Sequence, residues 1–114
     1  MSTTFGQTLR KFRHAKNVSQ RELAERTEVD FSYISKIEND RLPPPAADTI
    51  VKICEVLEIS AGQLLVLAGK VPTEVKEAIG SSEAAIQFIR DAQAMKLTED
   101  EWQKLNKQLK RLRR

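Results

Sequence analysis

The chain has 114 residues, of which 40% are hydrophobic and only 5% aromatic, and its net charge is +3 at pH 7. This length suits one compact domain plus an appendage. The single cysteine, Cys54, excludes an internal disulfide and a cysteine-cluster metal site; it lies in an apolar stretch and is expected to be buried. No signal peptide and no apolar run near 18 residues is found, so a soluble, intracellular protein is expected.

Basic residues gather near both ends of the chain. Between Met1 and Arg21 there are five basic residues and no acidic one, and from Lys104 to Arg114 there are six basic residues and again no acid. Each run taken alone is explained as well by a solvated face as by contacts with phosphate groups.

The first expected helix covers residues 5–16. Thr4 and Gln7 have the spacing of a capping box, which defines where the helix begins. Asn17 is suited to end it. The inward face has residues four and three positions apart: Phe5, Leu9 and Phe12.

Residues 19–39 encode two short helices joined by a tight turn. Ser19 and Glu22 form a capping-box pattern for the first helix, over residues 20–26, and the second helix covers residues 31–39. The inward positions of both helices and the turn are small or apolar: Leu23, Ala24, Val29, Ile34 and Ile37.

The second of these helices shows solvent a polar face with little negative charge. Asp30 or Ser32 can cap its N-terminus. Its outward positions are Phe31, Ser32, Ser35, Lys36 and Asn39. This arrangement predicts a helix-turn-helix, whose second helix enters the major groove of DNA. The N-terminal basic run is then expected to touch phosphates.

Two further helices follow a loop that contains three consecutive prolines and cannot be helical there. One covers residues 46–57, and the other covers residues 61–67, with a capping-box pattern at Ser60 and Gln63 and a stop at Gly69. The apolar face of the longer one is formed by Ile50, Ile53, Cys54 and Leu57.

Small, apolar and polar positions agree with the spacing of one known family: Gln20, Leu23-Ala24, Val29, Tyr33-Ile34-Ser35, Ile37-Glu38-Asn39 and Leu42-Pro43-Pro44-Pro45. On these residues, the segment 4–69 resembles the Cro/C1-type helix-turn-helix regulators, also called the xenobiotic-response-element (XRE) family. The resemblance implies an all-α fold in which residues 1–70 form a five-helix, lambda-repressor-like DNA-binding domain. The family usually has glycine where this chain has Glu28, and a left-handed backbone there costs a non-glycine residue about 1 kcal/mol.

Base edges in the major groove carry distinct donors and acceptors. Phe31 can contact a thymine methyl group, and Lys36 can reach guanine O6 and N7 or a phosphate. Ser32 and Ser35 can each form one hydrogen bond. The resemblance implies that positions 31, 32 and 36 are the main base readers. Contacts with the DNA backbone, which set the register, are expected from Gln20, Asn39, Arg41 and, more weakly, Arg10.

A free carboxylate at Glu38 would repel DNA. In the resembling family a glutamate at this position pairs with an arginine of the first helix, which corresponds to Arg13 here. A structural Arg13–Glu38 ion pair is therefore expected, and Arg13 is not counted as a DNA contact.

Residues 71–114 are expected to form a second, helical region. Ser81 or Ser82 caps one helix, and Thr98 with Glu101 has the capping-box spacing for the last one. Helices are expected over three ranges: 73–79, 83–96 and 99–112. The last two make a helical hairpin with a one- or two-residue turn.

Both helices of this hairpin carry apolar stripes. They consist of Ala85, Phe88, Ile89, Ala92 and Met95 on one helix and of Trp102, Leu105, Leu109 and Leu112 on the other. A hairpin of this size is too small to fold alone, so the stripes must bury against the first domain or, as we favour, against a second subunit. Two copies related by a two-fold axis place their recognition helices about 34 Å apart, which predicts a homodimer on an inverted repeat in double-stranded DNA.

Two alternatives stay open. The fold can serve as an antitoxin or adaptor whose C-terminal helices bind a partner protein, with Trp102 in the contact surface. A repressor of this general shape can also be inactivated by a partner metallopeptidase that cuts near the dimerisation helices.

No enzyme is expected. The single histidine, His14, lies in a basic helix, and no nucleophile motif, phosphate loop or metal-ligand spacing appears. The acidic run at residues 99–101 suits a helix N-terminus better than a metal site. We therefore expect no catalytic residue, metal or cofactor, and a regulator that works in the cytoplasm of a bacterium or as part of a phage.

Overall fold

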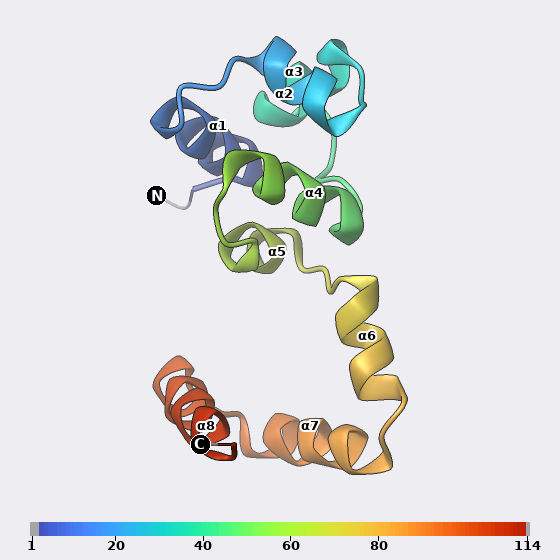
Figure 1. The fold of residues 1–114 in the computed structure, drawn as a ribbon, viewed down its shortest axis with the longest axis vertical. Coiled ribbons are helices and arrows are strands. Elements are labelled where there is room, and N and C mark those ends of the chain that lie inside the picture. The colour runs from blue at the N-terminus through green and yellow to red at the C-terminus, as the bar shows by residue number, and fades with distance from the viewer. Residues whose placement is uncertain (1–2, 114) are drawn as a thin grey trace. The chain divides into compact units, whose positions relative to one another are not determined.

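The computed structural model describes residues 3–113, and eight α-helices but no strands lie within that range (Figure 1). The all-α prediction is confirmed. Met1, and Arg114 of the C-terminal basic run, lie outside the described residues. The helices are α1 (Phe5–Ala15), α2 (Gln20–Thr27), α3 (Phe31–Glu38), α4 (Ala47–Leu57), α5 (Gly62–Ala68), α6 (Thr73–Gly80), α7 (Glu83–Met95) and α8 (Glu99–Arg111).

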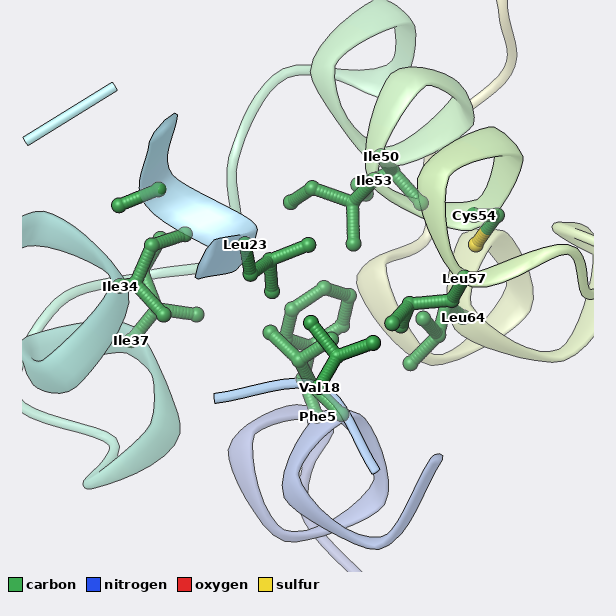
Figure 2. Close-up of a cluster of buried hydrophobic side chains, with 12 residues drawn as sticks. Phe5, Val18, Leu23, Ile34, Ile37, Ile50, Ile53, Cys54, Leu57 and Leu64 are labelled. Carbon is green, nitrogen blue, oxygen red and sulfur yellow. The ribbon is translucent and has the colours of Figure 1, made fainter. Parts of the chain in front are cut away.

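Helices α1 to α5 surround one aliphatic core. Figure 2 shows Leu23 of α2 between the isoleucines of α3 and the apolar side chains of α4 and α5. The inward faces predicted for α1 to α4 are confirmed, with Phe12 and Val29 partly buried at the edge. Burial raises the pKa of the Cys54 thiol to about 11. The core consists of Phe5, Leu9, Val18, Leu23, Ala24, Ile34, Ile37, Ile50, Ile53, Cys54, Leu57 and Leu64.

Two of the predicted capping boxes form completely. The hydroxyl of Thr4 accepts a hydrogen bond from the Gln7 N–H, and the Gln7 side chain accepts one from the Thr4 N–H, both at 3.1 Å. Thr98 and Glu101 make the same reciprocal pair at the start of α8. The hydroxyl of Ser82 caps α7, which decides between the two serines considered. These caps set the start points of three helices.

Two other predicted boxes do not form. Ser19 caps α2 by accepting from the Glu22 N–H at 3.0 Å, but the Glu22 carboxylate pairs with Arg26 at 3.3 Å. An arginine one turn later competes for that carboxylate. The Ser60–Gln63 box is wrong, because the Ser60 hydroxyl accepts from the N–H only two residues on. Helix α5 therefore begins one residue later than expected, with no side-chain cap.

The turn between α2 and α3 has the backbone conformation that the sequence predicted. Glu28 lies in the left-handed region, with φ of 59°. Asn17 has φ of 55° directly after the end of α1, and Gly69 ends α5 with φ of 65°. Glu28 carries backbone strain of about 1 kcal/mol that a glycine would not, whereas asparagine tolerates this region better.

The chain divides into two compact units, and the division lies between Val75 and Lys76, within α6. Lys70 donates to the carbonyl oxygens of Pro44 and Pro45, at 3.0 and 2.8 Å. The Thr73 N–H and hydroxyl donate to the carboxylate of Asp48, at 3.0 and 2.7 Å. These bonds attach the start of α6 to the first unit.

The second unit contains α7 and α8, joined through residues 96–98. Lys96 turns into the left-handed region, with φ of 51°, so α7 ends one residue early and the connection is longer than expected. The rings of Phe88 and Trp102 meet with centroids 6.4 Å apart and planes tilted by 60°. Of the described residues, none belongs to a helix long and apolar enough to cross a membrane.

Candidate nucleic-acid interface

Helix α3 is anchored on one side and open to solvent on the other. Ile34 and Ile37 are fully buried, while Phe31, Ser32 and Lys36 on the opposite side are exposed. The helix is therefore held rigidly by the core and is not enclosed by its own unit. The side predicted to face DNA contains most of the side chains predicted to read bases; Ser35 is half-buried at its edge.

The start of α3 differs from the prediction in one detail. Asp30 occupies the N-cap position with an extended backbone, but its carboxylate makes no capping hydrogen bond, and the alternative cap, Ser32, lies inside the helix. The N–H groups of Tyr33 and Ile34 bond instead to the backbone carbonyl of Asp30, at 3.0 and 3.3 Å. A side-chain cap for α3 was therefore the wrong expectation.

The expected Arg13–Glu38 ion pair is present and buried. Arg13 donates through Nε to one Glu38 oxygen at 2.6 Å and through Nη2 to the other at 2.8 Å. Its Nη1 donates to the carbonyl of Val18 at 2.9 Å. The pair joins α1 to the end of α3. Burial raises the pKa of Glu38, but hydrogen bonds from Arg13 and other donors outweigh it and hold the pKa below 4.5.

Three residues expected to contact the DNA backbone join this ion pair in one network. Gln20 Nε2 donates to Glu38 at 3.0 Å, and Arg10 Nε lies 3.5 Å from the same oxygen. Arg10 Nη2 also donates to Asn39 Oδ1 at 2.8 Å, and the Asn39 amide donates to the carbonyl of Ser35. The sequence alone indicates no link among Arg10, Gln20 and Asn39, each of which is expected to contact the DNA backbone. The structure brings them together where α1, the start of α2 and the end of α3 meet.

A close approach of α1 to the end of α3 was missed. The Gly6 N–H donates to Asp40 Oδ1 at 3.1 Å, and the Thr4 hydroxyl donates to Asp40 Oδ2 at 2.7 Å. A Cβ on Gly6 would lie 2.6 Å from the carbonyl oxygen of Glu38. Only glycine permits this approach. The sequence offered one signal: glycine is unfavourable within a helix, yet Gly6 lies in the first helical turn, where no chain reversal requires it.

The sequence alone places Arg21 only in the N-terminal basic run and gives it no role of its own. In the structure its guanidinium lies over the ring of Phe31, with Cζ 4.8 Å from the ring centroid. Arg41 is exposed directly after α3, and its N–H donates to the carbonyl of Lys36 at 2.8 Å. The exposed side of α3 is thus flanked by cationic groups, as a surface that meets phosphates requires.

The stripe predicted for dimerisation is largely uncovered in the second unit. Phe88, Ile89, Met95 and Leu109 are exposed, with exposed fractions of 70% for Met95 and 63% for Leu109. Ala85, Trp102 and Leu105 are half-buried, and they line an apolar groove of about 450 Å³ together with neighbouring residues. Ala92 is an exception, because it is already buried within its own unit and offers little surface to a partner.

Among residues 3–113 no group of three or more His, Cys, Asp or Glu side chains could hold a metal ion. The two surfaces described above are the cationic one around α3 and the apolar one on α7 and α8.

Similarities to known proteins identify the family of this chain. A helix-turn-helix family model matches residues 9–64. The transcriptional repressor RghR of Bacillus subtilis (strain 168) is 34% identical over 111 residues, which cover 92% of this chain and 82% of RghR. RghRB of the same organism, an HTH-type transcriptional regulator, is 32% identical over 91 residues; the match covers 77% of this chain and 66% of RghRB, just under two thirds.

Solved structures of the regulator SinR are also similar. SinR in complex with DNA aligns with 54% of this chain and 98% of that chain, at 35% identity and a TM-score of 0.52. SinR in complex with SinI aligns with 94% of this chain and 95% of that chain, at 26% identity and a TM-score of 0.53. These proteins are regulators, in agreement with the prediction that the chain is not an enzyme. The chain belongs to the Cro/C1-type (XRE) helix-turn-helix family and is a DNA-binding transcriptional regulator.

Proposed function

We propose that this regulator is a homodimeric repressor, possessing one DNA-binding unit per subunit, that binds an inverted repeat with α3 in the major groove. One observation carries the proposal: α3 is fixed by buried Ile34 and Ile37 while Phe31, Ser32 and Lys36 are exposed. Two similar proteins support it, since SinR has been solved with DNA and RghR is named a repressor.

We assign the base contacts to the exposed residues of α3. Phe31 at the N-terminal end packs on a thymine methyl group, and Ser32 and Lys36 donate hydrogen bonds to base edges. Ser35 is half-buried and contributes less. The N-terminal end of a recognition helix leads into the groove, so Phe31 and Ser32 reach deepest.

The network around Glu38 positions the contacts with the DNA backbone. Arg10, Gln20 and Asn39 bond to one another or to Glu38, so their remaining donors are held in place before DNA arrives. Arg41 follows Asn39 by two residues and is exposed. Preorganised donors lose less conformational entropy when they bind. We propose that these four residues hold phosphates and thereby set the register of α3.

The second unit supplies the dimer contact. Its exposed apolar side chains gather on one pair of helices. Full burial of such a side chain is favourable by roughly 1.5–3 kcal/mol, and because these side chains are already partly buried, each gains less than that against a second copy. Two-fold pairing matches the symmetry of an inverted repeat. The protein works on double-stranded DNA in the bacterial cytoplasm, whether a bacterial or a phage gene encodes it.

A second candidate role for the same helices is binding a different protein. SinR has been solved with SinI, and that alignment covers nearly the whole of this chain. The apolar groove that includes Trp102 suits a partner helix as well as a second copy. An antitoxin or adaptor role in which the C-terminal helices bind a partner protein, and inactivation by a metallopeptidase, stay predictions.

Selection of bound duplexes from a random pool at a fixed salt concentration tests the proposal. The wild type is expected to enrich an inverted repeat. Lys36→Ala is expected to lose preference at a specific position by roughly 5- to 150-fold, and Ser32→Ala, which loses a single hydrogen bond, is expected to lose less at its own position. Lys76→Ala, which removes the same charge from the second unit, serves as the control. Unchanged preference in both α3 variants would show that α3 does not read the sequence.

A further inference from the structure

Phe31, the first residue of α3, contacts a cationic side chain of α2. The guanidinium of Arg21, from the first turn of α2, lies over the ring of Phe31, with Cζ 4.8 Å from the ring centroid. Phe31 is 42% exposed, and Arg21 is exposed as well. The pair therefore forms at the surface, at the end of α3 that would enter the groove first.

Arg21 is not engaged elsewhere in the described part of the chain. Its guanidinium has no hydrogen bond or ion pair with another residue in the range 3–113, whereas Arg13 and Arg10 are bound to Glu38, and Arg26 is paired with Glu22. Its N–H donors remain available, while its position is restrained by the ring. A cation over an aromatic face gains about 0.5–1 kcal/mol at an exposed site.

The contact with Phe31 occupies only the ring side of the guanidinium. Five N–H groups lie in the guanidinium plane, and one aromatic ring cannot engage all of them, so donors stay open on the other side. Two such donors match the O6 and N7 acceptors of guanine, which is the commonest specific contact of arginine with DNA. A phosphate could also accept from them, but the aromatic contact draws the group toward α3 and the base edges.

We propose that Arg21 and Phe31 act as one recognition unit, in which the ring orients the guanidinium so that Arg21 reads a guanine beside the base pair that Phe31 touches. This inference rests on the proposed binding mode of α3. It adds a specificity-determining residue from α2, which the sequence had assigned only to a basic run.

The test is selection of bound DNA by the full-length protein at one stated salt concentration. Arg21→Ala is expected to lose the guanine preference at one position of each half-site by roughly 5- to 150-fold. Phe31→Leu keeps apolar bulk but removes the ring, and is expected to weaken the same guanine preference; Phe31→Tyr keeps it. Arg26→Ala removes an equal charge from the same helix and should leave the preference unchanged.

Two results would overturn the inference alone, while α3 still reads DNA. In one, Arg21→Ala weakens binding to all sequences equally and lowers the salt slope by about 1, as loss of a phosphate contact does. In the other, Phe31→Leu leaves the guanine preference intact. If the wild-type protein enriches no sequence, the proposed function fails and this inference fails with it. Circular dichroism on each variant verifies that the exposed substitutions leave the helices folded.

Discussion

Glu38 is the residue on which the geometry of the first unit depends most. Its buried carboxylate accepts hydrogen bonds from Arg13 and Gln20, with Arg10 nearby. Removing one partner of a buried ion pair leaves the other charge uncompensated. Glu38→Gln is therefore expected to lower the free energy of unfolding by about 3 kcal/mol at pH 7, measured by urea denaturation.

The matched control is Glu22→Gln. It removes a carboxylate whose ion pair with Arg26 is exposed, so a change below about 1 kcal/mol is expected. Equal losses from Glu38→Gln and Glu22→Gln would contradict a structural role for the buried pair.

The lowered pKa of Glu38 also predicts the pH dependence of stability. Its carboxylate is favoured in the folded state, so its stabilising contribution is complete above the ordinary pKa of 4.5. That contribution is lost as the pH falls through the lower folded-state pKa. Urea denaturation between pH 7 and pH 3 should show a steeper loss for the wild type than for Glu38→Gln. Parallel curves would exclude Glu38 as the group responsible.

Glu28 stores strain in the turn between α2 and α3. Its backbone lies in the left-handed region, where a Cβ is unfavourable. Glu28→Gly should therefore be more stable than Glu28→Ala by about 1 kcal/mol in thermal unfolding. Both variants remove the carboxylate that lies 3.3 Å from Lys52, so their difference isolates the Cβ. A less stable glycine variant would contradict the strain.

At the scale of elements, Gly6 controls how closely α1 approaches the end of α3. A Cβ there would overlap the backbone of α3 and the carboxylate of Asp40, so the two helices would have to separate. Gly6→Ala is expected to cost about 2–3 kcal/mol and to weaken specific DNA binding, because α3 would shift. Denaturation and gel-shift titration measure the two effects.

Gly62→Ala provides the comparison for that prediction. A Cβ at Gly62 meets only the Ser60 hydroxyl, at 3.7 Å, and alanine favours a helix. This variant should be neutral or stabilised. If Gly6→Ala were equally well tolerated, the close approach would not constrain α3.

Elements that depend on local pattern could be predicted from the sequence. The inward stripes of α1 to α4 and the left-handed turn at Glu28 follow from spacing and backbone sterics within a few residues. The Ser19 box failed for an equally local reason, since Arg26 takes the carboxylate that would have completed it.

Contacts between distant segments could not be predicted in the same way. Gly6 and Asp40 are 34 residues apart, and Arg10 and Asn39 are 29 apart. No periodicity relates such pairs, because they meet only after helices pack. The Arg13–Glu38 pair was foreseen solely through the family resemblance, and the Arg21–Phe31 contact was not foreseen at all.

At the scale of the whole molecule, we expect the apolar stripe of the second unit to set the oligomeric state. Leu109 is 63% exposed, so Leu109→Asp should leave the monomer folded but place a charge in a dimer contact. Sedimentation at micromolar concentration is expected to show a dimer for the wild type and a shift to monomer for this variant. Gln103→Asp adds the same charge at an exposed polar position of α8 and should remain dimeric.

A wild-type protein that sediments as a monomer, with DNA affinity unchanged when residues 81–114 are removed, would refute the proposed homodimer. If the wild type is dimeric and Leu109→Asp remains so, the contact lies elsewhere.

Site-directed crosslinking measures whether α3 lies in the major groove. Cys54 is buried with a thiol pKa of about 11, so Ser32→Cys supplies the one readily modified thiol among the described residues for a photo-crosslinker. We predict crosslinks to bases within each half of the selected site, and none from the control Gln103→Cys. Crosslinks from position 103 but none from position 32 would show that α3 does not lie in the major groove.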